Sequence, residues 1–186
     1  MSTAQHILES SLKLFYRYGF HASGVDFLSQ EAGVTKKTLY RHYSSKDALI
    51  EAALELRHTQ FMLKMRAFIM AAMVEKRPLS YIDFIVSWVQ EEGFYGCAFI
   101  NATAEFSDPD TSPHQQAIKH KKEVQSFLHN ICSAVDGVLH PEHIAEQLFM
   151  IGEGIIVTCQ VQGYEAKKIG TAQELARLAW VSATRS

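Results

Sequence analysis

Apolar residues recur every three or four positions near the start of the chain, with polar residues between them. This period predicts an amphipathic helix over residues 4–18, which Gly19 ends as a C-cap. Two shorter periodic segments follow it. We expect Ser23 to cap a second helix and Thr35 to cap a third, which runs to about Tyr43.

The rest of the chain continues the helical pattern, interrupted mainly by glycine and proline. We expect a long helix from residue 46 to about 74, and further helices over about 79–92, 97–106, 114–135, 141–162 and 171–184. The run from Ile155 to Val161 is rich in β-branched residues and would also suit a strand. Since no second strand is available to pair with it, we interpret it as helix. The whole pattern predicts an all-α fold.

A Gly-Val-Thr sequence at residues 33–35 joins the second and third helices. Glycine permits the sharp turn that links the two short helices of a helix-turn-helix. The third helix presents hydrogen-bond donors and an aromatic ring without a carboxylate: Lys36, Lys37, Thr38, Tyr40, Arg41 and His42. This composition suits the major groove of DNA. The pattern alone leaves an ordinary helical hairpin with a solvated basic face equally open.

Charge is distributed unevenly along the 186 residues, whose net charge is −2. Residues 1–46 hold six basic and three acidic side chains, a formal charge of +3, whereas the remainder holds twelve and seventeen, a charge of −5. This asymmetry favours a polyanionic partner for the N-terminal part.

Composition excludes several other classes of protein. A hydrophobic content of 47% excludes general disorder, and the three cysteines are too few and too scattered for a disulfide framework. We recognise no signal peptide, membrane span, metal-ligand spacing or catalytic motif, and therefore expect a cytoplasmic protein that is not an enzyme and has no metal, cofactor or membrane partner.

Four stretches resemble the DNA-binding domain of the tetracycline-repressor-like (TetR) family of transcriptional regulators. They are residues 7–20, 25–34 (VDFLSQEAGV), 38–43 (TLYRHY) and 46–49 (KDAL). The resemblance implies an N-terminal three-helix helix-turn-helix DNA-binding domain at residues 1–46. It also implies an all-helical ligand-binding and dimerisation domain at residues 47–186.

The resemblance further implies a homodimeric transcriptional regulator, most simply a repressor that a small-molecule effector releases from a pseudo-palindromic operator in double-stranded DNA. One alternative is a DNA-binding repressor that needs no ligand. Another is a helical small-molecule-binding protein or enzyme with a vestigial helix-turn-helix. The sequence indicates neither the effector nor the operator, and it does not distinguish a repressor from an activator.

Transferred position by position, the resemblance places the helix-turn-helix at about Gly24–Tyr43. It implies base contacts from Thr35, Lys36, Lys37, Tyr40 and Arg41, and phosphate contacts from Ser23, Thr38, His42, Tyr43 and Lys46. Two of these residues have a structural alternative. His42 is as easily a structural residue, and Tyr43 also suits packing between the third and fourth helices.

Two helical stripes in the second part are candidates for a ligand pocket. Tyr81, Phe84 and Trp88 recur at helical spacing, and Phe127 is a further aromatic candidate. Cys97, Asn101 and Glu105 lie at i, i+4 and i+8 on one helix face. Such stripes also occur as plain core and as a structural polar network. For the homodimer we expect the apolar faces of the helices at about 141–162 and 171–184 to meet their copies.

Overall fold

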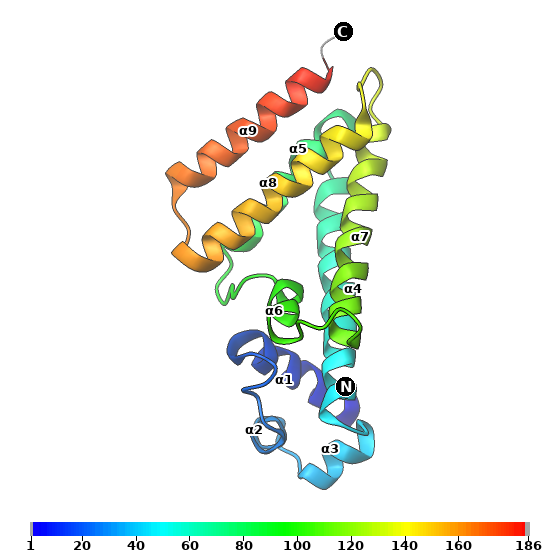
Figure 1. The fold of residues 1–186 in the computed structure, drawn as a ribbon, viewed down its shortest axis with the longest axis vertical. Helices are drawn as coiled ribbons and strands as arrows, with labels where there is room; N and C mark the ends of the chain where they lie inside the picture. Colours follow the sequence, from blue (N-terminus) through cyan, green and yellow to red (C-terminus); the bar gives the residue numbers. More distant parts are fainter. Residues whose placement is uncertain (1, 185–186) are drawn as a thin grey trace. The chain divides into compact units, whose positions relative to one another are not determined.

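The computed structural model describes residues 2–184, and every regular element in this range is helical (Figure 1). The α-helices are α1 (Thr3–Tyr18), α2 (Val25–Glu31), α3 (Lys36–His42), α4 (Lys46–Met70), α5 (Arg77–Val89), α6 (Ala98–Glu105), α7 (Ser112–Ser133), α8 (Pro141–Gln162) and α9 (Ala166–Thr184), with a 3-10 turn at Val74–Lys76. The predicted all-α fold is confirmed. Residues 155–161 lie inside α8, so the helical interpretation of this β-branched run is also confirmed.

The described residues pack as two units. One contains residues 2–60 together with 97–120, and the other contains 61–96 together with 121–184. This division of the packing does not follow the predicted boundary between residues 46 and 47. The first part of α4, α6 and the first part of α7 belong to the same unit as α1, α2 and α3. The division into a DNA-binding domain at residues 1–46 and a ligand-binding domain at residues 47–186 therefore stays a prediction.

In the first unit, α1, α2 and α3 contact one another (Figure 1). They enclose a small apolar core. Ile7 of α1, Leu28 of α2 and Leu39 of α3 are fully buried there. Phe15 and Phe20 stack with their ring centroids 5.4 Å apart and close the core at the end of α1. The position of α3 is thus fixed by its buried side, and its other side faces solvent.

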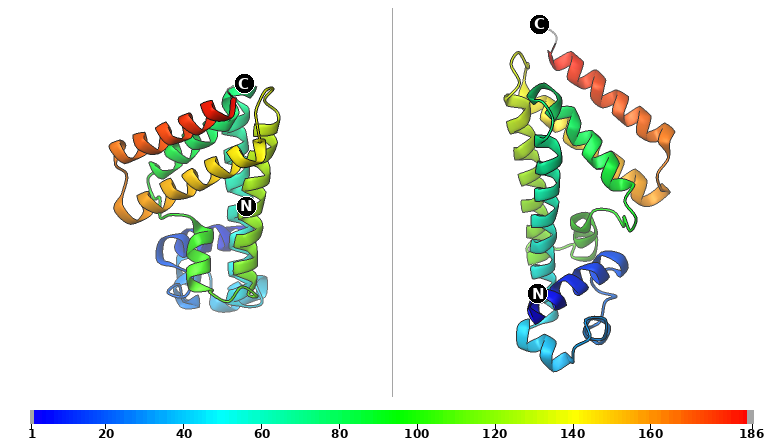
Figure 2. Two further views of the ribbon diagram at one scale, coloured as in Figure 1. Left: turned by 45° about the horizontal axis from the view of Figure 1, so that its top comes forward. Right: turned by 180° about the vertical axis from the view of Figure 1, so that it is seen from behind.

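In the second unit, α5, α8 and α9 pack side by side (Figures 1 and 2). Of the described helices, α8 alone is long and apolar enough to cross a membrane, judged by length and composition. Its buried residues include Ile144, Leu148 and Ile156. Because α8 packs against both α5 and α9, part of its apolar surface belongs to the core of this unit.

Two helix ends differ from the expected positions by four residues or more. α4 ends at Met70 instead of about 74, and Arg77 Nε donates a hydrogen bond to the carbonyl of Ala72 in the turn that follows (3.2 Å). α9 begins at Ala166 instead of 171. An interior glycine such as Gly170 lowers helix propensity by about 1 kcal/mol but does not by itself end a helix.

α5 and α8 approach each other closely at Gly152. A Cβ atom at this position would lie 2.6 Å from the hydroxyl oxygen of Tyr81, which is 1% exposed. Neither the buried ring nor the helix backbone has room to move away in a close-packed interior. The absence of a side chain at residue 152 therefore sets the distance between the two helices.

We expect Gly152→Ala to lower the free energy of unfolding by about 1–3 kcal/mol, the usual range for overpacking a core. Chemical denaturation at fixed protein concentration measures this value. The matched control is Gly170→Ala in α9, where an added Cβ meets nothing within 4 Å. The control should raise stability by about 0.5–1 kcal/mol because alanine is the better helix former. Equal stability changes in the two variants would contradict the close approach.

Candidate nucleic-acid interface

The turn between α2 and α3 is built by the backbone of residues 32–35. Gly33 adopts a φ of 62°, the left-handed region that glycine enters without strain. Its N–H donates to the carbonyl of Gln30 (2.9 Å), and the N–H of Val34 donates to the carbonyl of Ser29 (2.9 Å). These bonds end α2 and redirect the chain into α3, which gives the helix-turn-helix geometry predicted from the sequence.

Thr35 caps α3, as the sequence predicts. Its Oγ1 accepts a hydrogen bond from the N–H of Thr38 (3.1 Å) and lies 3.0 Å from the hydroxyl oxygen of Thr38. The cap satisfies one of the free N–H groups in the first turn of the helix. This end of α3 is exposed, so its remaining N–H groups can face an anion such as a phosphate.

The solvent-facing side of α3 carries most of the predicted contact residues. Lys37, Arg41 and His42 are exposed, Tyr40 is 46% exposed, and Thr38 is half-buried. Two permanent cations, an imidazole and a phenol therefore project from one short helix whose opposite side is anchored by Leu39. This arrangement can donate hydrogen bonds to base edges and phosphates in a groove.

A carboxylate lies closer to this face than the sequence of α3 suggests. Lys36 forms an ion pair with Asp26 of α2, whose side chain is 81% exposed. An ion pair so open to water contributes little stability, so Lys36 can exchange its partner for a phosphate or a base. The pairing of Asp26 could not be predicted from the sequence because its partner lies in a different helix.

Ser23 does not have the role predicted for it. The N-cap of α2 is Gly24, and the Ser23 side chain is fully buried. The hydroxyl of Ser23 donates to the carbonyl of Gly19 (2.7 Å), with the carbonyl of Leu14 3.5 Å away. Both the cap and the phosphate contact of this side chain are therefore corrected: Ser23 fixes the turn after α1.

Two further predicted phosphate ligands already have partners inside the first unit. The hydroxyl of Tyr43 donates to the carbonyl of Ala4 in α1 (3.0 Å), and burial raises the pKa of this phenol. Lys46 Nζ donates to the carbonyl of His21 (3.2 Å). Tyr43 is thus held within the first unit, but its hydroxyl is bound to α1 and not to the third or fourth helix as the structural alternative expected. Lys46 reaches back to the turn after α1.

The predicted ligand residues divide between the two units. Tyr81, Phe84 and Trp88 are buried in the second unit, where Phe61 contacts the rings of Phe84 and Trp88 at centroid distances of 5.5 and 5.1 Å. Phe127 is half-buried in the same unit, with the Arg66 guanidinium 5.5 Å above its ring. These aromatic side chains form part of a packed core.

The polar stripe on α6 lies in the first unit. Cys97 is buried at the N-cap of α6, and Asn101 is half-buried. Glu105 departs from the expectation, because its carboxylate accepts hydrogen bonds from the turn between α1 and α2. These bonds favour the alternative of a structural polar network for Glu105.

A histidine pair also lies in the first unit, and the sequence analysis did not predict it. His58 Nδ1 and His120 Nδ1 are 3.0 Å apart, and the buried His120 ring stacks on Phe99 with a centroid distance of 3.8 Å. One nitrogen must accept this bond, so at least one ring has no proton on its Nδ1. Among the described residues no group of three or more His, Cys, Asp or Glu side chains could hold a metal ion.

The three cysteines are all buried. Burial raises the pKa of the Cys132 thiol to about 12 and also raises that of Cys159. Because the thiolate is the reactive form, Cys132 and Cys159 are poor nucleophiles at neutral pH. Their surroundings are those of small core residues.

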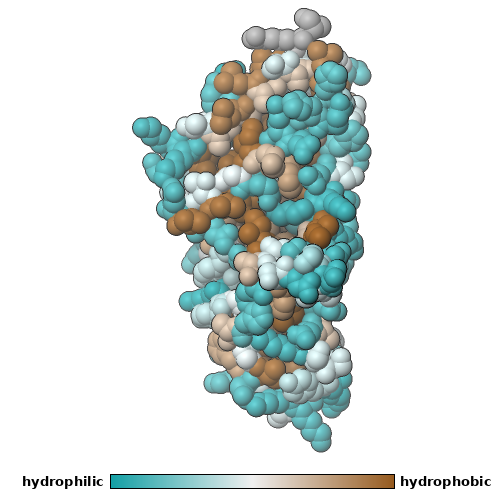
Figure 3. All heavy atoms as spheres, viewed as in Figure 1, coloured by the Kyte–Doolittle hydropathy of each residue, from teal (hydrophilic) through white to brown (hydrophobic). Residues whose placement is uncertain are grey.

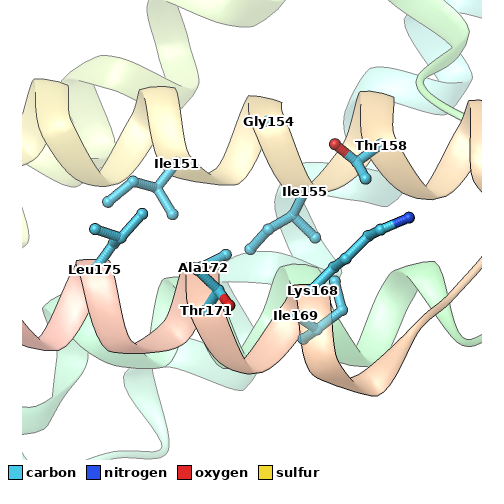
Figure 4. A pocket seen from close by; sticks show the side chains of 9 residues that line it. All are labelled: Ile151, Gly154, Ile155, Thr158, Lys168, Ile169, Thr171, Ala172 and Leu175. Atoms are coloured by element: carbon cyan, nitrogen blue, oxygen red, sulfur yellow. The ribbon is translucent and has the colours of Figure 1, made fainter.

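Apolar side chains of α8 and α9 line an open groove of about 410 Å³ (Figure 4). The groove residues are Ile151, Gly154, Ile155, Thr158, Lys168, Ile169, Thr171, Ala172 and Leu175. Large apolar side chains are exposed on the same two helices: Met150, Val157, Val161, Leu175 and Leu178. Brown apolar surface is visible over these helices in the space-filling view (Figure 3).

Comparison with known proteins agrees with this geometry. The sequence profile described as "Bacterial regulatory proteins, tetR family" matches residues 7–53. The HTH-type transcriptional regulator YjdC of Escherichia coli is 24% identical over 92% of this chain and 90% of its own length. The HTH-type transcriptional repressor ComR of the same organism is 25% identical over 87% of this chain and 81% of its own. Among solved structures, SCO4454, a TetR-family regulator from Streptomyces coelicolor, has a TM-score of 0.89 at 26% identity and covers 99% of this chain and 91% of its own.

Proposed function

Since this chain belongs to the TetR family of transcriptional regulators, we propose that it is a homodimeric, cytoplasmic repressor that a small-molecule effector releases from a pseudo-palindromic operator. The observation that carries the proposal is the exposed face of α3, where Lys37, Tyr40 and Arg41 project from a helix anchored by Leu39. A regulator of this kind performs no chemical step, so its mechanism consists of binding and a shift between two conformations.

In the proposed complex, α3 lies in the major groove. Thr35 at the start of α3 reaches base edges together with Lys36, Lys37, Tyr40 and Arg41, while Thr38 and His42 contact phosphates. Gly24 is the N-cap of α2 and has no atom within 4 Å of the place of its missing side chain, so the DNA backbone can approach it closely. Lys46 contributes charge near the same edge.

The dimer is proposed to form through α8 and α9. Their shared groove and five large exposed apolar residues form an apolar surface that is unusual for a monomer in water. A two-fold axis would pair each helix with its own copy in a four-helix interface. One dimer then places two α3 helices on successive major grooves, about 34 Å apart.

We propose that the effector binds in the helical body, and each unit offers its own candidate residues. In the second unit these are the aromatic residues Tyr81, Phe84, Trp88 and Phe127, and in the first unit they are Cys97 and Asn101 of α6. Aromatic side chains with few polar groups are the usual lining of small-molecule sites. The effector would favour a dimer whose α3 helices no longer match two grooves. Repression is the proposed direction, and the likeness to the repressor ComR supports it.

Selection of genomic fragments by the purified protein tests this proposal, followed by titration of the best duplex over a range of salt concentrations. We expect a pseudo-palindromic site and a slope of log K against log salt of about −4 to −8, because several phosphates are neutralised by a symmetric dimer. Failure to enrich any sequence at low salt, with a folded dimer confirmed by sedimentation, would refute the proposed function.

A further inference from the structure

The carboxylate of Glu105, the last residue of α6, is bound by the turn between α1 and α2. Oε1 accepts a hydrogen bond from the N–H of Phe20 (2.8 Å), and Oε2 accepts one from the N–H of His21 (2.6 Å). His21 Nδ1 lies 2.9 Å from Oε2 and completes the set when it carries a proton. These residues are 84 and 85 positions apart in the sequence. Glu105 thus ties α6 to the segment that leads into the helix-turn-helix.

The turn leaves space for this carboxylate at Gly19. A Cβ atom at residue 19 would lie 2.8 Å from Glu105 Oε1, and Gly19 has a φ of 90°. The glycine therefore ends α1 and admits the carboxylate at the same place. Burial alone would raise the pKa of Glu105, but the hydrogen bonds from His21 and Phe20 outweigh it, and the pKa lies below its usual value. The bonds are in place at neutral pH and are lost as the pH falls through that lowered pKa.

Other residues hold the same turn from different sides. Lys46 Nζ binds the carbonyl of His21, and the hydroxyl of Ser23 binds the carbonyl of Gly19. The His21 ring also lies against Phe106, next to Glu105, with a centroid distance of 4.8 Å. α2 begins at Val25, immediately after this turn. A displacement of the Glu105 carboxylate therefore acts on the start of α2 without a flexible linker between them.

We infer that Glu105 is a positioning residue for DNA binding, which couples the position of α6 to that of α2 and α3. The inference rests on the proposed function and deepens it. Cys97 and Asn101, proposed to meet the effector, lie two turns and one turn before Glu105 in the sequence of α6. By linkage, an effector that moves α6 changes operator affinity, and operator binding must restrict the motion of α6 by the same coupling free energy.

Amide hydrogen exchange tests the coupling without an effector. The probe is the selected operator duplex, and the readout is the exchange rate of the amides of α6 with and without DNA. In the wild type, we expect operator binding to slow exchange in α6 at least about fivefold, the lower end of typical coupling between two sites. In Glu105→Gln the slowing should fall below about twofold. An amide group in place of one carboxylate oxygen faces N–H donors with its own N–H groups and cannot restore both bonds.

Two further variants distinguish the loss of coupling from a non-specific effect of the substitution on the first unit. Glu55→Gln makes the same change of charge in the first unit, at an exposed residue whose contact to Lys119 is 4.0 Å long, and it should keep the wild-type slowing. His21→Ala removes the side-chain bond and the ring contact with Phe106 but leaves both backbone N–H donors, so it should keep most of the slowing. In the DNA-free protein, the amides of Phe20 and His21 should exchange faster in Glu105→Gln than in either of these variants.

Equal slowing of α6 in the wild type and in Glu105→Gln would overturn the coupling while leaving the proposed function intact. Unchanged exchange at Phe20 and His21 in Glu105→Gln would also overturn it, and this second readout needs no DNA. Failure of the wild type to bind any duplex would instead refute the proposed function, and the titration shows this directly. Circular dichroism of each variant confirms that it is folded.

Discussion

Replacing Tyr40 by alanine is expected to weaken operator binding by about 30-fold or more, and Lys37→Ala should have an effect of similar size. Each good contact to a base edge contributes about 1–3 kcal/mol, and a symmetric dimer loses the contact in both half-sites, or about 2–6 kcal/mol in total. Both side chains are exposed and lie outside the core. Thermal unfolding should therefore stay near the wild-type curve while the operator titration shifts.

Asp26→Asn is the matched control for these two variants. It removes the carboxylate that pairs with Lys36, and the surface around the exposed side of α3 becomes more positive. We expect tighter binding to operator and random duplex alike at low salt, with a steeper salt dependence, because Lys36 is then free to neutralise a phosphate. Unchanged operator affinity in both Tyr40→Ala and Lys37→Ala would show that α3 does not read the DNA.

Replacing both Leu175 and Leu178 by glutamate is expected to dissociate the dimer and to lower operator affinity by about 100-fold or more. Both leucines are exposed on α9, so the charges meet water in the monomer and one another across the proposed interface. When two half-sites are bound by linked modules, the second contact benefits from an effective concentration that raises overall affinity by about 10²–10⁴. Sedimentation measures the dissociation, and titration measures the affinity.

Leu63→Glu serves as the matched control, because Leu63 is also an exposed leucine but lies on α4. This control should stay dimeric and bind operator as the wild type does. A double variant that remains a dimer at micromolar concentration would place the interface on a different surface of the protein.

The helices could be predicted from the sequence because each depends on local signals. Periodic apolar residues, Gly19 and Gly33 at turns and the Thr35 cap all act within a few residues of the structure that they determine. The start of α9 could not be predicted, since Gly170 resembles a helix end locally and only packing of the helix against its neighbours overrides it. Ser23 is the opposite case: a good capping residue whose hydroxyl is taken by the carbonyl of Gly19.

The local features of the candidate site could also be predicted from the sequence, but its long-range contacts could not. The exposed residues of α3 follow from its periodicity and from the family resemblance, which names their roles. The partners of Asp26 and Glu105 do not follow, because each contact joins segments that are separate in the sequence. A carboxylate at helical spacing with Cys97 and Asn101 looks like a pocket residue until the turn at Phe20 and His21 is seen to bind it. Long-range contacts of single polar groups leave no periodic signal.

Because all three cysteines are buried, thiol reagents should label the unmodified protein very little. A single cysteine introduced at the exposed Gln30 of α2 would be the fastest-reacting thiol in the chain, since maleimide and methanethiosulfonate reagents attack exposed thiolates. A dimer would then carry one spin label on each helix-turn-helix. Pulsed electron spin resonance measures the distance between the two labels. Measured with and without a candidate compound, this distance would show whether the compound changes the spacing of the two helix-turn-helix segments, even while the operator sequence is unknown.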